Sequence, residues 1–110
     1  MKSLRKKAKI AIIGGTGFEK LFINIEQVIV GTPYGLPPPL FVGEIASKKV
    51  VFLPRHGVEH SVPPHKVNYR ANIYALYETG VERIIAINAV GAINKSLKPG
   101  DIVIPHDFAD

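Results

Sequence analysis

Three short stretches rich in apolar and β-branched residues constrain the fold of this chain most strongly. They span residues 10–13, 50–53 and 81–87, and each run ends in a loop of glycine or polar residues. Such runs, when turn residues bound them, are typical of strands buried within a sheet. Residues 67–79 carry apolar side chains near helical spacing, and Gly80 follows as a stop signal. Strands that alternate with a crossover helix predict an α/β fold.

The remaining segments predict the rest of the sheet and its connections. Residues 31–39 contain four prolines and two glycines, so they are expected to form a turn-rich surface connection and not a helix interior. Short apolar or alternating runs elsewhere indicate further strands. These are residues 23–30, a hairpin of residues 40–46 and 49–53 that turns at Ser47 and Lys48, and residues 102–105 after a turn at 97–101.

Composition favours an ordinary globular chain of at most one domain. Of its 110 residues, 46% are hydrophobic and 21% charged. The net charge of +5 arises at the N-terminus, since five of the 14 basic residues lie within the first nine positions and the other nine equal the acidic residues in number. A solvated basic tail explains this pattern better than a nucleic-acid surface. No cysteine, signal peptide or membrane-length apolar run is present, so an intracellular, cytoplasmic protein is expected.

The loop after residues 50–53 holds three of the four histidines and begins with Arg55 and His56. A guanidinium offers a planar fork of donors, and an adjacent imidazole offers a titratable donor, so the pair is suited to binding an oxyanion such as phosphate. The structural alternative is that Arg55 pairs with a carboxylate while the histidines satisfy loop carbonyls.

Two other loops also follow predicted strands. After residues 10–13, a glycine-rich turn carries Thr16, whose hydroxyl and neighbouring backbone N–H groups suit a phosphate. Its spacing matches neither common nucleotide fingerprint, so a plain strand-to-turn connection is the alternative. After residues 81–87 comes a small-residue turn beginning at Asn88. Because ligands of open α/β sheets bind at the carboxyl ends of strands, the three loops are expected to converge on one site.

Six motifs, in order and in spacing, give the chain a resemblance to a known family. Together they are similar to the methylthioadenosine phosphorylase branch of the trimeric purine nucleoside phosphorylases. The motifs are Gly14-Gly15-Thr16-Gly17, Thr32-Pro33-Tyr34-Gly35, Arg55-His56-Gly57 with His60, residues 64–73, Ala89-Val90-Gly91, and residues 99–105 with Asp107-Phe108.

The resemblance implies a reaction and a set of site residues. Phosphate would attack the anomeric carbon of a purine nucleoside and release the base and a sugar 1-phosphate. This reaction needs no metal or organic cofactor, and phosphate is the co-substrate. For 5′-methylthioadenosine the products are adenine and 5-methylthioribose 1-phosphate. The residues that match phosphate-binding positions are Thr16, Arg55, His56, Asn88 and Ala89, the last through its backbone, while His60 matches a position near the sugar.

Asn88 leaves the base preference open. Methylthioadenosine phosphorylases usually carry Thr or Ser at the matching position, whereas the Asn-Ala-x-Gly pattern is similar to that of the 6-oxopurine nucleoside phosphorylases. A 6-oxopurine nucleoside or methylthioinosine is therefore the alternative substrate.

The resemblance also implies an architecture and a partner. It predicts an α/β fold with a central mixed sheet flanked by helices, in which residues 1–8 form a basic tail and residues 9–110 the N-terminal part of a phosphorylase domain. Because family members are more than twice as long, the domain is expected to be incomplete at the C-terminus, with the base-binding residues beyond Asp110. A homotrimer or dimer of trimers is expected at full length, with no nucleic-acid or membrane partner. An inactive fragment or subunit that binds phosphate or nucleoside is the alternative of another class.

Overall fold

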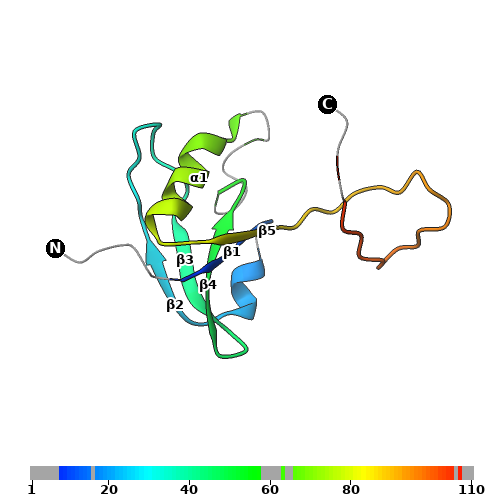
Figure 1. Cartoon of the computed structure of the whole chain (residues 1–110), viewed down its shortest axis with the longest axis horizontal. Helices are drawn as coiled ribbons and strands as arrows, with labels where there is room; N and C mark the ends of the chain where they lie inside the picture. Colours follow the sequence, from blue (N-terminus) through cyan, green and yellow to red (C-terminus); the bar gives the residue numbers. More distant parts are fainter. Residues whose placement is uncertain (1–7, 16, 58–62, 64–65, 106, 108–110) are drawn as a thin grey trace.

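Five strands form one mixed sheet with an α-helix on one face (Figure 1). The computed structural model describes residues 8–15, 17–57, 63, 66–105 and 107. The sheet order is β2-β3-β4-β1-β5, in which β1 pairs in parallel with both β4 and β5, and β2, β3 and β4 pair antiparallel. The strands are β1 (Ile10–Gly14), β2 (Ile23–Val28), β3 (Leu40–Ile45), β4 (Lys48–Pro54) and β5 (Arg83–Ala86), and the helices are α1 (Tyr69–Glu78) and the 3₁₀ turn η1 (Phe18–Leu21).

The three runs that predicted buried strands form the parallel strands β4, β1 and β5. The prediction of burial is confirmed for β4 but wrong for β5, which lies at the edge of the sheet with all four residues exposed. β1 lies between β4 and β5, with Ile12 opposite Phe52 on one side and Ile85 on the other. α1 lies between β4 and β5 in the chain and covers one face of the sheet, so the predicted crossover helix is confirmed (Figure 1). Because β4, β1 and β5 are parallel, the carboxyl ends of these three strands lie at one edge of the sheet.

Two apolar clusters fill the two faces of the sheet. The larger one packs α1, through Ala75 and Leu76, against strand residues such as Val51 and Leu53. The smaller one centres on Phe52, which is fully buried. The larger cluster contains Ala8, Ala11, Val28, Val30, Leu40, Val42, Val51, Leu53, Ala75 and Leu76, and the smaller one contains Phe22, Val50 and Phe52.

The helix begins and ends where its end residues satisfy the backbone. Asn68 is the N-cap, and its Oδ1 accepts a hydrogen bond from the Ala71 N–H at 3.1 Å. Its Nδ2 donates to Tyr34 O at 2.7 Å, which ties the proline-rich connection to the helix. Gly80 ends the helix with a φ of 87°, as the sequence predicted. The helix is shorter than the predicted residues 67–79 because it begins after the N-cap Asn68 and ends before the C-cap Thr79.

The hairpin between β3 and β4 turns one residue earlier than the sequence predicted. Lys48 pairs with Ile45, so Ala46 and Ser47 form a two-residue loop with φ values of 51° and 67°. Positive φ at both central positions is the pattern of a type I′ turn, which suits the twist of a hairpin. The prediction placed the turn at Ser47 and Lys48 because these two polar residues separate two apolar runs, whereas the pairing register decides the position of the turn.

Ser47→Gly is expected to stabilise the protein by about 0.5 to 1 kcal/mol, because glycine adopts positive φ without the steric cost that a Cβ carries. The midpoint of urea unfolding should rise with an unchanged slope. The matched control is Ser96→Gly, which alters an exposed serine in a loop whose side chain bonds to Asn94 Oδ1 and should not raise the midpoint. An equal rise in both variants would contradict the turn assignment.

The last predicted strand, residues 102–105, is not formed. Residues 87–105 carry no strand or helix and extend away from the sheet (Figure 1). Ile102 and Ile104 are 93% and 89% exposed. Their apolar pattern suits a strand, but a strand needs a paired neighbour, and none of the described strands lies beside them.

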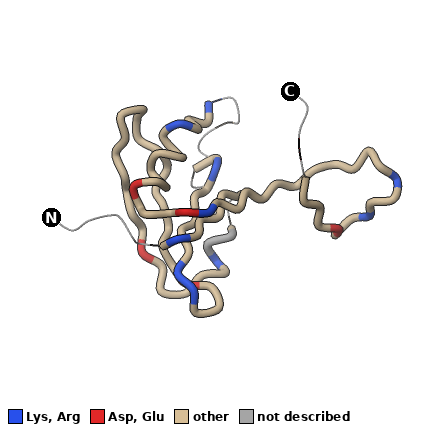
Figure 2. The backbone as a smooth tube through the Cα atoms, in the orientation of Figure 1, with Lys and Arg blue, Asp and Glu red and all other residues tan. Residues whose placement is uncertain are grey.

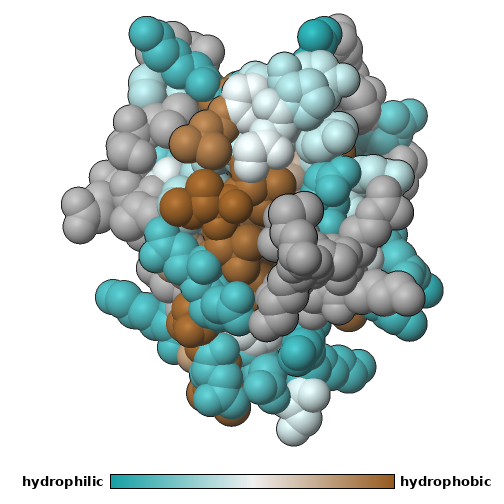
Figure 3. Space-filling model, turned by 90° about the vertical axis from the view of Figure 1, so that its left-hand side faces the viewer, coloured by the Kyte–Doolittle hydropathy of each residue, from teal (hydrophilic) through white to brown (hydrophobic). Residues whose placement is uncertain are grey.

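Charged residues are mixed over the surface, whereas hydrophobic residues gather on one side. Basic and acidic residues intermingle along the body, in line with its neutral balance (Figure 2). On the side where β2 lies, hydrophobic residues form a band between hydrophilic ones (Figure 3). Ile23 and Ile25 of β2 are 61% and 44% exposed. None of the helices in the described part of the chain is long and apolar enough to cross a membrane.

Candidate functional site

Arg55 and His56 are the two central residues of a turn at the end of β4. The Gly57 N–H donates to Pro54 O at 2.9 Å and closes the turn, and Gly57 has a φ of 76°. The Arg55 N–H donates to Gly14 O at 3.0 Å. The turn is therefore bonded through its backbone to the end of β1, and the position of Arg55 does not depend on its side chain.

The same edge of the sheet positions Asn88. The Ile87 N–H donates to Ile13 O at 2.8 Å, which extends the pairing of β5 with β1 by one residue. Asn88 then leaves the sheet, and its Oδ1 accepts a hydrogen bond from Arg55 Nη1 at 2.6 Å. A second, longer bond of 3.4 Å joins Arg55 Nη1 to Ile87 O. Residues 33 positions apart in sequence thus meet because their strands both pair with β1.

The described contacts of Arg55 include no carboxylate that would neutralise its charge. The described oxygens that accept from it are a side-chain amide and a backbone carbonyl, both neutral. Its Nε donates to His56 Nε2 at 3.3 Å, so the imidazole lies beside the guanidinium. The alternative in which Arg55 pairs with a carboxylate is not what the described residues show. A cation held by neutral groups retains its attraction for an anion.

A cavity of about 330 Å³ opens at this edge, and we call it the strand-end cavity. Strands, turns and helix all contribute to its wall. Its lining residues are Ile13, Arg55, Tyr69, Asn72, Ile73, Ala86 and Asn88.

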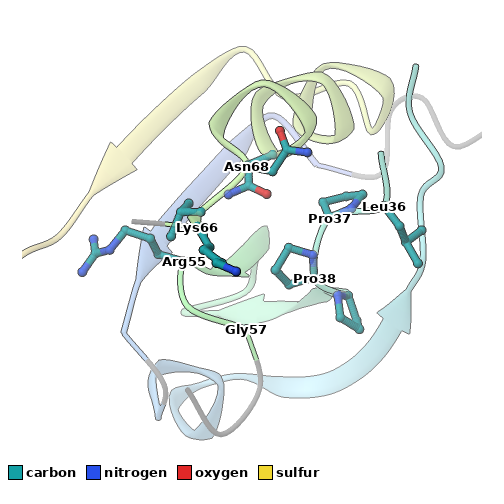
Figure 4. A pocket seen from close by; sticks show the side chains of 10 residues that line it. Leu36, Pro37, Pro38, Arg55, Gly57, Lys66 and Asn68 are labelled. Carbon is teal, nitrogen blue, oxygen red and sulfur yellow. The ribbon is translucent and has the colours of Figure 1, made fainter. Parts of the chain in front are cut away.

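A second cavity, of about 400 Å³, lies beyond Arg55, and we call it the proline cavity. The prolines of the connection before β3 form one side and the residues before α1 the other (Figure 4). The side chain of Arg55 extends away from the prolines toward β5, drawn in yellow (Figure 4). Arg55 and Asn72 line both cavities, and the described lining carries the cations Arg55 and Lys66 with no acidic side chain. Both spaces therefore favour an anionic or neutral ligand.

The predicted site residues are in part brought together. Arg55, His56 and Asn88 lie in hydrogen-bond contact, and Ala89 follows Asn88 on an exposed stretch of chain. Thr16 and His60 lie outside the described residues. Gly14 pairs with Pro54, so the glycine loop does leave the sheet beside Arg55. The predicted convergence at the strand ends is confirmed for the described residues, and the phosphate-binding roles stay predictions.

Asn72 is a site residue that the sequence did not assign. It lies in the first half of α1, is only 3% exposed, and lines both cavities. The available signal was an amide on a helical face otherwise formed by Ala71, Ala75 and Leu76. A polar residue on an apolar face indicates either a buried hydrogen bond or a ligand contact, and the sequence could not separate the two.

No described group of three His, Cys, Asp or Glu side chains could hold a metal ion. The polar groups that line the strand-end cavity are the guanidinium of Arg55, the hydroxyl of Tyr69 and the amides of Asn72 and Asn88. Such donors bind and orient an oxyanion.

The fold is that of the nucleoside phosphorylases. The chain belongs to the phosphorylase superfamily, whose family model matches residues 9–110. It is 58% identical over 103 residues to the S-methyl-5′-thioadenosine phosphorylase of Pyrococcus abyssi, covering 93% of this chain and 40% of that protein. It is 54% identical over 102 residues to the probable 6-oxopurine nucleoside phosphorylase of Korarchaeum cryptofilum, covering 93% and 37%.

A solved structure agrees with the fold. The crystal structure of a methylthioadenosine phosphorylase from an antarctic soil metagenomic library superimposes with a TM-score of 0.80 at 45% identity. The match covers 86% of this chain and 34% of that one. The chain therefore spans about two fifths of the length of the curated relatives it matches.

Proposed function

We propose that the protein containing these residues catalyses the phosphorolysis of a purine nucleoside, with 5′-methylthioadenosine as the substrate. The observation that carries the proposal is the contact of Arg55 with His56 and Asn88 at the ends of parallel strands. The name of the Pyrococcus abyssi relative supports the choice of substrate. Phosphate is the co-substrate, and the proposal assigns no metal or organic cofactor.

The physical basis is the fixing of an anion against a sugar that becomes cationic. In phosphorolysis the glycosidic C–N bond breaks, its electron pair leaves with the base, and a phosphate oxygen bonds to the anomeric carbon. Arg55 would bind the phosphate through two donors, with Thr16, His56, Asn88 and the Ala89 backbone orienting the other oxygens. Positioning the nucleophile and stabilising charge in the transition state are the two largest contributions that such a site makes.

The second candidate substrate is a 6-oxopurine nucleoside. Asn88 and the name of the Korarchaeum cryptofilum relative favour it, and the two relatives differ by only four percentage points in identity. Identity over this stretch does not separate the two bases.

A panel of nucleosides tests the proposal. The protein is purified at the length at which its own cells make it and is incubated with phosphate and 5′-methylthioadenosine, adenosine, inosine or methylthioinosine. We expect adenine release from 5′-methylthioadenosine to have the highest kcat/KM. Preferred release of hypoxanthine would transfer the assignment to the 6-oxopurine class, and no base release from any nucleoside would contradict phosphorolysis.

The proposed partners are the nucleoside, phosphate and further copies of the chain. A trimer in the cytoplasm is the expectation from the resemblance. Sedimentation equilibrium of the native protein tests the trimer, and cell fractionation tests the compartment.

A further inference from the structure

The side-chain oxygen of Asn72 is a buried acceptor that the described part of the chain leaves unsatisfied. This atom, Oδ1, has no hydrogen-bond partner among the described residues. Thr79, the buried polar residue at the C-terminal end of α1, is satisfied by contrast: its hydroxyl donates to Leu76 O at 2.8 Å. Leaving a buried acceptor unsatisfied costs about 1 to 3 kcal/mol, so an acceptor of this kind calls for an explanation, and a bound ligand is one.

The position of Asn72 indicates which ligand. Asn72 and Arg55 are the two residues common to the strand-end cavity and the proline cavity. An amide beside an unneutralised guanidinium therefore lies where an oxyanion would bind. The terminal torsion of asparagine is soft, so Oδ1 can turn toward either cavity without breaking a protein hydrogen bond.

An acceptor such as Oδ1 can bind only an anion that carries a proton to donate. An oxyanion without a proton has only acceptors to offer, so it gains nothing from Oδ1. Phosphate at neutral pH is a mixture of monohydrogen and dihydrogen forms, each with at least one O–H donor, whereas sulfate carries no proton. We infer that Asn72 accepts a hydrogen bond from the protonated oxygen of phosphate and so makes the site selective for phosphate over sulfate. The inference rests on the proposed function, since it concerns the same anion.

The structure also explains why Asn72 and not Asn68 has this role. Asn68 is one helical turn earlier and also lines the proline cavity, but its Oδ1 caps α1 and its Nδ2 bonds to Tyr34 O. Both ends of that amide are occupied. Asn72 has the same side chain with Oδ1 unoccupied, and a site that must recognise a hydroxyl group rejects the analogue lacking it.

The test compares the affinities of the two anions by titration calorimetry on wild type and Asn72→Leu, using the protein at its native length. Leucine has nearly the shape of asparagine and no polar atom. We expect wild type to bind phosphate about 10- to 100-fold more tightly than sulfate, the scale of one hydrogen bond involving a charged group. Asn72→Leu should lose most of that preference through weaker phosphate binding, while its affinity for sulfate stays within about twofold.

The free protein gives the second readout. Replacing an unsatisfied buried amide by leucine should leave the unfolding temperature unchanged or raise it. The matched control, Thr79→Val, removes a satisfied buried hydroxyl at the far end of the same helix. It should lower the unfolding temperature and leave the phosphate-to-sulfate ratio at the wild-type value. If Asn72→Leu does not fold, Asn72→Asp keeps the shape and an acceptor, and its preference for phosphate should persist while both anions bind more weakly.

Each result separates the inference from the proposed function. Equal loss of affinity for both anions in Asn72→Leu, or an unchanged preference, would overturn the role of Asn72 and leave phosphorolysis standing. Absence of phosphate binding in wild type would contradict the proposed function itself.

Discussion

Arg55→Ala is expected to lower kcat/KM for phosphorolysis by about 2 to 4 kcal/mol of transition-state stabilisation and to raise the KM for phosphate. Among the described residues that line the strand-end cavity, the charged group is the Arg55 guanidinium, and the described oxygens that accept from it are neutral. The variant therefore removes the charge that an anion would meet there. The expected loss is the scale of one preorganised donor acting where charge develops. Initial rates at limiting and saturating phosphate measure both constants.

The fold should survive this substitution. The Arg55 N–H bond to Gly14 O and the turn bond from the Gly57 N–H to Pro54 O both belong to the backbone and persist in the alanine variant. Arg55→Lys keeps the charge but loses the planar fork, so its kcat/KM should fall between those of wild type and Arg55→Ala.

Arg83→Ala is the matched control for the loss of a cation. Arg83 pairs with Ile10 at the amino end of β5, opposite the edge where Asn88 lies. Its side chain is exposed, and its removal should leave both kinetic constants near their wild-type values. Unchanged kinetics in Arg55→Ala, or an equal loss in Arg83→Ala, would contradict the assignment of Arg55.

Phe52→Ala is expected to destabilise the protein by about 3 to 5 kcal/mol. Phe52 has no exposed surface and packs edge-on against Phe22, with ring centroids 6.1 Å apart. It also packs against Phe41 at 6.4 Å, so the substitution opens a cavity in the middle of the smaller cluster. Such a loss is a large part of the stability of an ordinary domain, about 5 to 15 kcal/mol.

Urea unfolding followed by circular dichroism measures the effect. Phe52→Leu retains most of the volume and should cost less than half as much as the alanine variant. Tyr77→Ala removes a ring that is 58% exposed, and its unfolding midpoint should change little. A midpoint for Phe52→Ala equal to that of Tyr77→Ala would show that β4 is not packed as described. Arg55 lies one residue beyond β4, so the same packing supports the site.

The elements that the sequence predicted correctly are those whose signal is local. The run at β4 is apolar and β-branched, and it forms a strand wherever a sheet can accept it. The end of the helix was predicted from Gly80, whose positive φ acts within one turn, whereas the N-cap Asn68 lies inside the predicted range and was not predicted as a cap. The position of the hairpin loop at Ala46 and Ser47 and the absence of a strand at residues 102–105 depend on pairing with another strand, which local pattern cannot supply.

In the site too, local sequence signals predicted some residues, whereas their contacts depend on how the strands pair. Arg55 and Asn88 were predicted because each follows an apolar run, and the rule for parallel strands places such residues at one edge. Their contact distance of 2.6 Å depends on the common pairing of β4 and β5 with β1, which no residue type encodes. Asn72 was not predicted because what distinguishes it is a hydrogen bond that its side-chain oxygen does not make. Only the packed structure shows that a buried amide oxygen has none among the described residues.

The fate of phosphate tests the central claim most directly. The protein at its native length is incubated with 5′-methylthioadenosine and inorganic phosphate, and ³¹P magnetic resonance follows the phosphate while absorbance follows the base. The account predicts that one phosphate becomes a sugar 1-phosphate for each base released and that no base appears without phosphate. Base release at an undiminished rate without phosphate, or phosphate that remains wholly inorganic, would contradict it.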